Sequence, residues 1–195
     1  MRDDRLYIVA CDDTYAPKQY FGFFRNPRIQ VHVIPAVPGQ NDAARVLDSL
    51  VSVEFEDGDE RWLLLDTDHY IQPNHIGGFM QVLQRANQAG INVALSRPCF
   101  EFWLLLHHSE DDAALDGAAD CTAVATQLRN ILGSYNKTNL RPEDFPRTTL
   151  QAACQRSRLR LVRFPGSPPQ GNASQVHQLW DSIFANASPD QRSAW

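Results

Sequence analysis

The chain contains the stretch "LLLDTDHY" (residues 63–70), in which three leucines run directly into two aspartates separated by one threonine. Together with Trp62, the leucines form a run that is apolar on both faces, which is typical of a central strand in a parallel sheet. A carboxylate at the end of such a strand is costly to bury unless something neutralises it. The stretch therefore predicts a buried central strand that ends in two acids, Asp66 and Asp68, whose charge must be balanced.

The segments around this strand alternate between strand and helix patterns. Alternating or β-branched apolar residues predict further strands at residues 6–10, 29–37 and 91–96. Helices are predicted between them and after them, one capped by Asn41 or Asp42, one stopped by Gly90 and one opened by Pro98. The first of these helices has four apolar residues on one face, namely Val46, Leu47, Leu50 and Val51. This alternation predicts an α/β layered fold with a mostly parallel central sheet flanked by helices.

The second half of the chain is expected to be mainly helical. Helices are predicted at residues 112–132 and 147–157, and an amphipathic helix at residues 173–187. Residues 133–147 contain two prolines and are expected to form a loop, whereas residues 159–164 are expected to form a short edge strand. We therefore expect a single domain over residues 1–195, with an α/β core at 1–110 and a helical extension at 111–195 packing on it.

Composition excludes several classes of protein. No apolar run approaches the roughly 20 residues that span a bilayer, and acids at the N-terminus are unlike a signal peptide, so the expected location is cytoplasmic, without a membrane. The net charge of −5 argues against binding nucleic acid over the whole surface. The scattered cysteines form no C-x-x-C pair, which argues against a zinc ribbon or a disulfide framework and favours buried free thiols. These cysteines are Cys11, Cys99, Cys121 and Cys154.

Acids follow two of the predicted strands. Asp12 and Asp13 end the first strand, and Asp66 and Asp68 end the third. Because ligands of open α/β sheets bind beyond the carboxyl ends of the strands, these side chains are expected at one edge. Clustered carboxylates repel each other, and Mg²⁺ characteristically takes one or two of them while keeping several waters. The pattern indicates a Mg²⁺ (or Mn²⁺) site, although a helix cap with a solvated turn would give the same spacing.

A later block of the chain carries a specific resemblance. Residues 96–108, "SRPCFEFWLLLHH", together with "WLLLDTDH" at residues 62–69, "YFGFF" at residues 20–24, "YNK" at residues 135–137 and the final helix, resemble the RloB family. The most specific match comprises Pro98, Cys99, Phe100, Glu101, Trp103, Leu104, Leu105 and His107. The resemblance covers most of the chain.

The resemblance implies a fold, a site and a role. The family is similar to Toprim-type domains, so it implies a Toprim-like layered fold. It implies Mg²⁺ bound by an acid after the first strand and by the aspartate pair after the third. The implied activity is nucleic-acid cleavage in bacterial anti-phage defence, with an AAA- or ABC-type ATPase as partner. The first loop departs from the family pattern, since Asp12 stands where a glutamate is usual, Asp13 replaces a glycine, and the second glutamate falls near Pro17.

Further candidate residues have competing interpretations. Glu101, in an apolar helix, either supports the site or pairs with an arginine such as Arg97. Lys137 either holds a scissile phosphate or is a solvated loop lysine. Arg158 and Arg160 would share one face of the expected edge strand and, with Arg97, bind a phosphate backbone, or would only protect that edge.

Three aromatic residues of the same block are expected to have structural roles. Trp103 is expected in the core because its neighbours have helical apolar spacing. His107 and His108 close that helix, where a cationic imidazole would be favourable at the helix C-terminus, with proton transfer as the alternative.

Two functions remain open on the sequence. The first is a Mg²⁺-dependent nuclease that hydrolyses RNA, with tRNA among the candidates, or DNA, as the toxic effector of a defence system. Its expected catalytic set is Asp12, Asp66, Asp68, Glu101 and Lys137. The second is a catalytically degenerate interaction module that binds the ATPase partner. A phosphotransfer enzyme ranks last, because the chain has no glycine-rich phosphate-binding motif.

Overall fold

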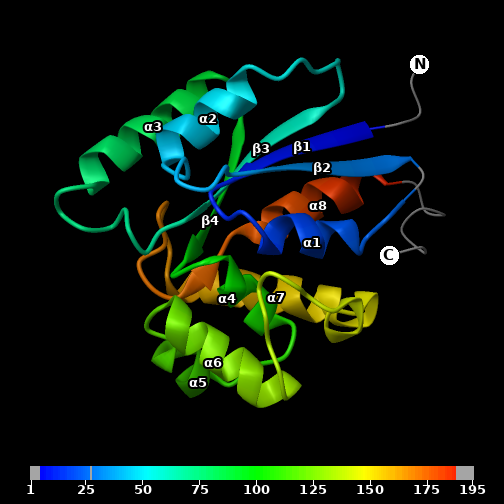
Figure 1. Cartoon of the computed structure of the whole chain (residues 1–195), viewed down its shortest axis with the longest axis vertical. Coiled ribbons are helices and arrows are strands. Elements are labelled where there is room, and N and C mark those ends of the chain that lie inside the picture. The colour runs from blue at the N-terminus through cyan, green and yellow to red at the C-terminus, as the bar shows by residue number, and fades with distance from the viewer. Residues whose placement is uncertain (1–4, 27, 188–195) are drawn as a thin grey trace.

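A five-stranded sheet forms the centre of the molecule (Figure 1). The computed structural model describes residues 5–26 and 28–187. The strand order is β2-β1-β3-β4-β5, and the first four strands are parallel, whereas β5 is antiparallel to β4. The strands are β1 (Arg5–Cys11), β2 (Ile29–Pro35), β3 (Glu60–Asp66), β4 (Asn92–Arg97) and β5 (Ala173–Ser174). The predicted α/β fold with a mostly parallel sheet is confirmed.

The leucine run occupies the middle of this sheet, as expected. β3 pairs with β1 on one side, where Leu64 lies opposite Cys11, and with β4 on the other, where Leu64 lies opposite Ala94. Leu63 and Leu65 enter one core cluster and Leu64 the other, because successive side chains of a strand point to opposite faces. Both faces are covered by helices, which explains why the strand shows no polar alternation.

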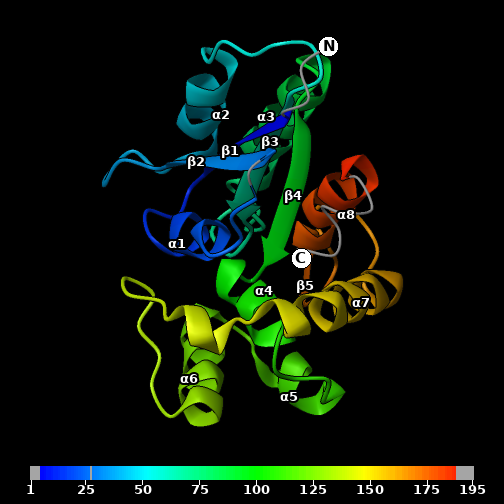
Figure 2. The same cartoon turned by 90° about the vertical axis from the view of Figure 1, so that its right-hand side faces the viewer.

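Helices α2 (Ala43–Val51) and α3 (Ile76–Gln88) cover one face of the sheet (Figure 2). Asp42 caps α2 by accepting the amide of Arg45, and three of the expected apolar residues are buried. The fourth, Val51, is 46 % exposed, so its predicted burial is wrong. It is the last residue of the helix.

Helices α1 (Ala16–Gly22) and α8 (Val176–Asn186) lie against the opposite face. Aromatic side chains fill this layer, and the ring of Tyr20 meets those of Phe21 and Trp180 edge-on at centroid distances of 5.1 and 6.3 Å. Such edge-to-face pairs add to the stabilisation that burial already gives. α8, which comes from the end of the described chain, is therefore part of the sheet layers.

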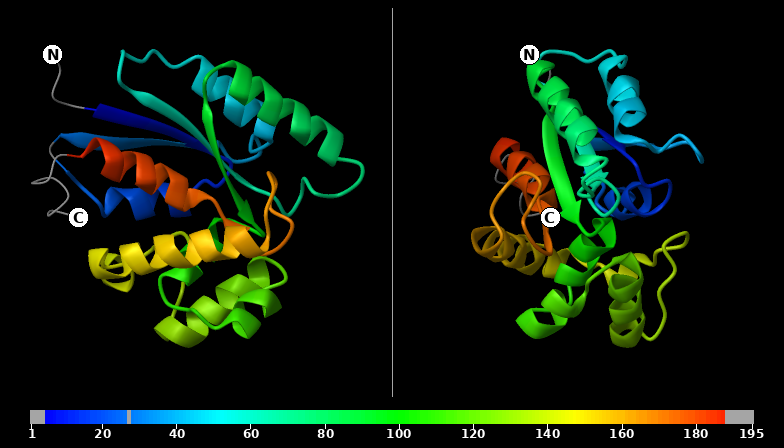
Figure 3. Two further views of the ribbon diagram at one scale, coloured as in Figure 1. Left: turned by 180° about the vertical axis from the view of Figure 1, so that it is seen from behind. Right: turned by 90° about the vertical axis from the view of Figure 1, so that its left-hand side faces the viewer.

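A further group of helices packs below the sheet and begins directly at the end of β4 (Figure 3). It comprises α4 (Phe100–Leu106), α5 (Asp112–Gly117), α6 (Cys121–Leu132), α7 (Arg147–Arg163) and the short 3₁₀ helix η1 (Pro142–Asp144). Every residue of α4 is buried, including Trp103, which confirms its core position. The first helical residue is Phe100, so the expectation that Pro98 opens this helix is wrong.

The predicted edge strand at residues 159–164 is wrong, because α7 continues through it to Arg163. The buried residues of α7 follow a helical spacing, and they are Leu150, Ala153, Cys154, Ser157 and Arg160. Leu159 and Val162, which suggested a strand, are exposed instead. β5 takes the place of the edge strand. The segment after residue 110 is mainly helical, as expected, but its β5 and α8 complete the sheet and cover it.

Arg160 is a buried part of this helical layer. Its guanidinium donates to Asp112 at 2.9 Å, to Asp116 and to the Asn172 carbonyl at 2.9 Å. Arg158 lies on the outer side of α7 and pairs with Asp181. The two arginines therefore do not share a face, and the strand geometry that suggested a phosphate-binding track is absent.

We expect Arg160→Met to lower the free energy of unfolding by about 1–3 kcal/mol, because it removes charge-assisted hydrogen bonds made in a buried setting. Arg158→Met is the matched control, since an exposed ion pair contributes only about 0–1 kcal/mol. Urea denaturation of both variants measures the difference. Equal effects of the two substitutions would contradict the structural role of Arg160.

None of the helices in the described ranges combines the length and the apolar character that crossing a bilayer requires.

Candidate functional site

The strand order places a ligand-binding position between β1 and β3. β2 and β3 both follow β1 in the chain, but β2 pairs with one edge of β1 and β3 with the other. The connecting helix α1 lies on one face of the sheet and α2 on the opposite face. Ligands of open α/β sheets bind at such a switch point, beyond the carboxyl ends of the strands. A pocket of about 330 Å³ lies there, and it is lined by acids from both strands. The pocket is thus where the topology predicts a site.

All five residues expected to be catalytic line this pocket. They are Asp12, Asp66, Asp68, Glu101 and Lys137. Asp13 is a sixth charged residue of the wall, so five carboxylates face one lysine. We call this the acid pocket. A phosphate group would be repelled from it unless a cation were also present.

Asp12 and Asp66 form the base of the acid pocket. The backbone amide of Asp66 donates to the two carboxylate oxygens of Asp12 at 3.1 and 3.3 Å. The carboxylate of Asp66 in turn accepts the amide of Phe100 at 2.8 Å. One bond joins the end of β3 to the loop after β1, and the other joins it to the start of α4. Both carboxylates are thereby fixed by backbone groups.

Among the described residues, no basic side chain forms an ion pair with Asp12 or Asp66. Removal from water, which the backbone hydrogen bonds oppose and the nearby charges of Asp13 and Asp68 reinforce, raises the pKa of Asp12 to about 8. Removal from water also raises the pKa of Asp66 well above its usual range, with Asp12 and Glu101 adding to the effect. Two adjacent carboxyls that resist ionisation together are a place where a divalent cation would be stabilised.

Lys137 neutralises two of the other three acids of the acid pocket. Its ammonium lies 3.1 Å from the Asp13 carboxylate and 3.7 Å from that of Glu101. Partial burial lowers the pKa of Lys137, but the two carboxylates outweigh this and raise it overall. Lys137 is therefore not a freely solvated loop lysine. Arg97, the arginine suggested as an alternative partner of Glu101, instead donates to the Pro169 carbonyl at 3.0 Å.

Asp68 lies on the wall of the acid pocket and has local partners. Its carboxylate accepts the Cys121 thiol at 3.3 Å and the backbone amide of His69 at 2.8 Å. The adjacent Thr67 is fully buried. Asp68 is thus held beside the Asp12–Asp66 pair and contributes negative charge to it.

The donor types fit Mg²⁺, but a complete metal-binding cage is not preformed. In the described part of the chain, no group of three or more His, Cys, Asp or Glu side chains converges as metal ligands. Mg²⁺ is usually held by one or two carboxylates, with waters and substrate phosphates filling the remaining positions. The paired carboxylates of Asp12 and Asp66 meet that requirement, and Asp68 does not join them as a third ligand here.

Sequence reasoning missed the role of Asp13. Besides its ion pair, its carboxylate accepts the amides of Tyr15 and Ala16, which fixes the start of α1. An aspartate a few residues before a helix that has Pro17 in its first turn is a recognisable cap signal. The neutral wall residues Cys99 and Cys121 come from other segments, and no local pattern could have placed them at the pocket.

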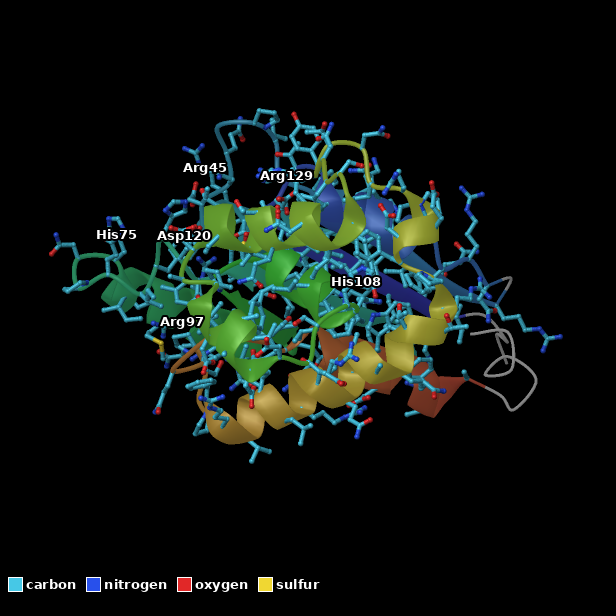
Figure 4. The ribbon with its side chains drawn as sticks, turned by 90° about the horizontal axis from the view of Figure 1, so that it is seen from below. Arg45, His75, Arg97, His108, Asp120 and Arg129 are labelled. Carbon is cyan, nitrogen blue, oxygen red and sulfur yellow. The ribbon has the colours of Figure 1, made fainter. Side chains whose placement is uncertain are left out.

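The histidines at the end of α4 lie outside the acid pocket. His107 is buried and hydrogen-bonds Tyr20 at 3.0 Å and Thr149 at 2.8 Å. Burial, with smaller effects from His108 and Arg156, lowers the pKa of His107 to about 3. Burial also lowers the pKa of His108, which is labelled in Figure 4, where the helices packed below the sheet face the viewer. The expected cationic cap is therefore wrong, because both imidazoles are neutral at pH 7.

Because the pKa of Asp12 is raised in the folded state, we predict that replacing this carboxyl stabilises the fold by an amount that depends on pH. A carboxyl whose pKa is higher in the folded state costs stability as pH rises from about 4 towards 8. In the presence of EDTA, we expect Asp12→Asn to raise the melting temperature at pH 8 by about 5 °C, since about 2 kcal/mol corresponds to a few degrees in a domain of this size. The gain should be much smaller at pH 4.5, because this pH is only just above the pKa of the unfolded carboxyl, so little of the cost of the raised pKa has built up.

Thermal melts of wild type and Asp12→Asn at the two pH values measure this difference. Asn keeps an oxygen that accepts the Asp66 amide, so the hydrogen bond itself is preserved. A gain that is equal at both pH values would show that charge at Asp12 is not its cause.

Comparisons with known proteins agree with the resemblance seen in the sequence. The model of the family described as RloB-like protein matches residues 7–183 of the chain. A search of curated proteins and a search of solved structures gave no match. The matched segment runs from β1 into α8 and includes every charged residue of the acid pocket. The chain therefore belongs to the RloB-like protein family.

Proposed function

We propose that the acid pocket is the active site of a Mg²⁺- or Mn²⁺-dependent nuclease. The observation that supports this most strongly is the uncompensated carboxylate pair of Asp12 and Asp66 at the switch point of the sheet. A divalent cation would relieve their repulsion, and a substrate phosphate would complete its coordination. When bound, such an ion polarises a phosphodiester and lowers the pKa of water.

The residues of the chain have separate tasks in this proposal. Asp12 and Asp66 hold the metal, and their backbone hydrogen bonds keep the carboxylates in place before it arrives. Asp68 adds negative charge beside them. Lys137 positions Asp13 and Glu101, and its half-exposed ammonium can also attract a phosphate oxygen. Glu101 is therefore a positioning residue that acts through Lys137.

The proposed substrate is RNA, with tRNA among the candidates, or DNA. The acid pocket is too negative to hold a phosphodiester without a metal, so the proposal requires strict dependence on a divalent cation. Of the three arginines expected to hold a nucleic-acid backbone, Arg97 is the last residue of β4, at the carboxyl edge of the sheet (Figure 4). Arg158 and Arg160 are engaged in ion pairs on α7.

Membership of the RloB-like family supports a wider biological proposal. We propose that cleavage makes the protein the toxic effector of an anti-phage system, and that an AAA- or ABC-type ATPase is its partner. Expression in bacteria tests the first part, since growth should stop only when the acid pocket is intact. Affinity capture against the product of a neighbouring ATPase gene tests the second.

A degenerate interaction module is the second candidate. The observation that favours it is that no three metal-ligating side chains converge among the described residues, while Lys137 already neutralises two of the acids. Incubation of the purified protein with labelled RNA and DNA in Mn²⁺ distinguishes the candidates. Metal-dependent cleavage supports the nuclease. Partner binding that survives without any cleavage of either substrate supports the module.

A further inference from the structure

A second cavity adjoins the acid pocket. It lies between α2 and α3, has a volume of about 550 Å³, and is lined by residues of both helices and of the loop after β3. Tyr70 lines this cavity and the acid pocket as well. We call it the α2–α3 groove. Figures 1 and 3 show the two helices side by side on one face of the sheet.

A flat aromatic surface forms one wall of the α2–α3 groove. The ring of Tyr70 is stacked on that of Phe79, with centroids 4.6 Å apart and planes only 3° from parallel. Phe79 is buried and therefore anchors the stack. The Tyr70 hydroxyl donates to the Asn41 carbonyl at 3.2 Å, which fixes the ring in its plane. Another planar ring could lie against such a rigid surface with little loss of side-chain entropy.

Small residues keep the rest of the groove open. Ala43 and Ala44 line the α2 side, and Gly78 lines the α3 side. A Cβ atom built on Gly78 would meet no atom within 4 Å, so the glycine leaves real space rather than permitting a tight contact. Gly78 also has an ordinary helical backbone, because its φ is not positive. Neither packing nor backbone conformation therefore explains a glycine at this position.

The polar groups of the groove suit a nucleobase better than a phosphate. The amide side chains of Asn74 and Gln81 line the groove, as does the imidazole of His75, whose Nδ1 lies 2.9 Å from the His69 carbonyl. These groups can hydrogen-bond the edge of a base. The nearby cations are already balanced, since Arg45 pairs with Asp42 and Arg85 with Asp48. The groove thus offers a ring surface and hydrogen-bonding groups without net positive charge.

We propose that the α2–α3 groove receives one unpaired base of a single-stranded nucleic acid whose backbone crosses the acid pocket. The inference rests on the proposed nuclease function and specifies its substrate as a strand with an accessible base. A base within a duplex is stacked and paired, so it could not enter the groove without being flipped out. Stacking against an aromatic side chain is tolerant of base identity, so the groove would select for single strands more than for sequence.

Binding of labelled 12-nucleotide single strands to the full chain tests the inference. Ca²⁺ replaces Mg²⁺ in this measurement so that the strands stay uncut. Ca²⁺ takes the same kind of oxygen ligands as Mg²⁺ but not its octahedral geometry. A series of strands carries one abasic position each, at successive places along the strand. Only one of these places should weaken binding to wild type, by about fivefold or more, given the usual contribution of base–aromatic stacking. A duplex of the same sequence should bind more weakly than the single strand.

Gly78→Leu is the decisive variant, and Gly77→Leu is its matched control. Leucine at residue 78 would fill the groove, whereas Gly77 is also in the first turn of α3 and equally open but does not line the groove. We expect Gly78→Leu to bind the intact strand about fivefold to tenfold more weakly and to lose the response to the abasic position. Gly77→Leu should behave like wild type in both respects.

The outcomes separate this inference from the nuclease proposal. Equal binding by the two leucine variants, no response to any abasic position, no strand binding at all, or preference for the duplex would each overturn the inference. Cleavage of the same strands in Mn²⁺ is measured separately. If the strands are cleaved but Gly78→Leu does not change strand binding, only the proposed base-binding role of the groove is contradicted. If Gly78→Leu weakens strand binding but no strand is cleaved, only the proposed nuclease activity is contradicted.

Discussion

Asp66→Asn is expected to reduce metal-dependent cleavage of RNA or DNA by about 10²- to 10³-fold, because a bound metal contributes several kcal/mol of charge stabilisation at the transition state. The Asp66 carboxylate stands beside that of Asp12 at the switch point of the sheet, with its charge uncompensated. The amide removes that charge but retains an oxygen for the Phe100 amide. Metal affinity should therefore fall while the junction of β3 and α4 stays intact.

Asp111→Asn is the control for this experiment. Asp111 also accepts backbone amides through one carboxylate oxygen, those of Ala113 and Ala114, but it caps α5 outside the acid pocket. Initial cleavage rates across a range of Mn²⁺ concentrations compare the three proteins. A rate for Asp66→Asn within twofold of wild type at every concentration would show that Asp66 takes no part in the reaction.

Lys137→Met is expected to destabilise the fold by about 2–4 kcal/mol, because loss of one partner leaves buried carboxylates uncompensated. Asp13 and Glu101 have side chains only 5 % and 6 % exposed, so water cannot take over the role of the ammonium. Half of the lysine side chain is exposed, which places the expected cost below that of a fully buried pair. The midpoint of urea denaturation, at an unchanged slope, measures the change.

Two further variants test the cause of this loss. Lys137→Arg keeps the positive charge and should retain most of the stability. Glu101→Gln removes one of the two buried charges, so adding it to Lys137→Met should recover part of what was lost, as coupled neighbours do in a double-mutant cycle. If Lys137→Met unfolds at the wild-type midpoint, the two acids do not depend on the lysine for their burial.

The sheet and its flanking helices were predictable because their signals are local. The leucines of β3 are apolar on both faces and required a covered central strand, which the structure confirms. Asp42 and Gly90 mark the start of α2 and the end of α3 by cap chemistry that depends only on neighbouring backbone. Where the periodicity was complete and the caps were present, the element was assigned correctly.

The errors arose where distant partners determine the structure. The sequence suggests a surface charge at Arg160, but in the structure Arg160 lies in α7, which continues to Arg163, and pairs with Asp112 and Asp116 of α5. The sequence suggests a cationic cap at His107, but in the structure its ring is buried and hydrogen-bonds Tyr20 and Thr149. In each case the missing information was a contact between segments more than 40 residues apart, which no local pattern contains.

The sequence predicted most of the charged residues that line the candidate site, but not which of them form ion pairs with each other. The two aspartates of the leucine stretch and Asp12 are brought together by the order of the parallel strands, which the sequence could indicate. That Lys137 pairs with Asp13 and Glu101, and so leaves Asp12 and Asp66 as the uncompensated acids, depends on how a loop from the helical half folds back. The pairing divides the acid pocket into a part that Lys137 neutralises and a part, formed by Asp12 and Asp66, that we propose binds the cation.

Calorimetric titration of Mn²⁺ into wild type, Asp66→Asn and Asp111→Asn tests most directly whether the Asp12–Asp66 pair binds a divalent cation. The structure predicts one binding event in wild type that is retained in Asp111→Asn and lost in Asp66→Asn. It further predicts that a single-stranded oligonucleotide tightens the binding, because a substrate phosphate completes the coordination. Identical heats for all three proteins, with and without the strand, would contradict the account.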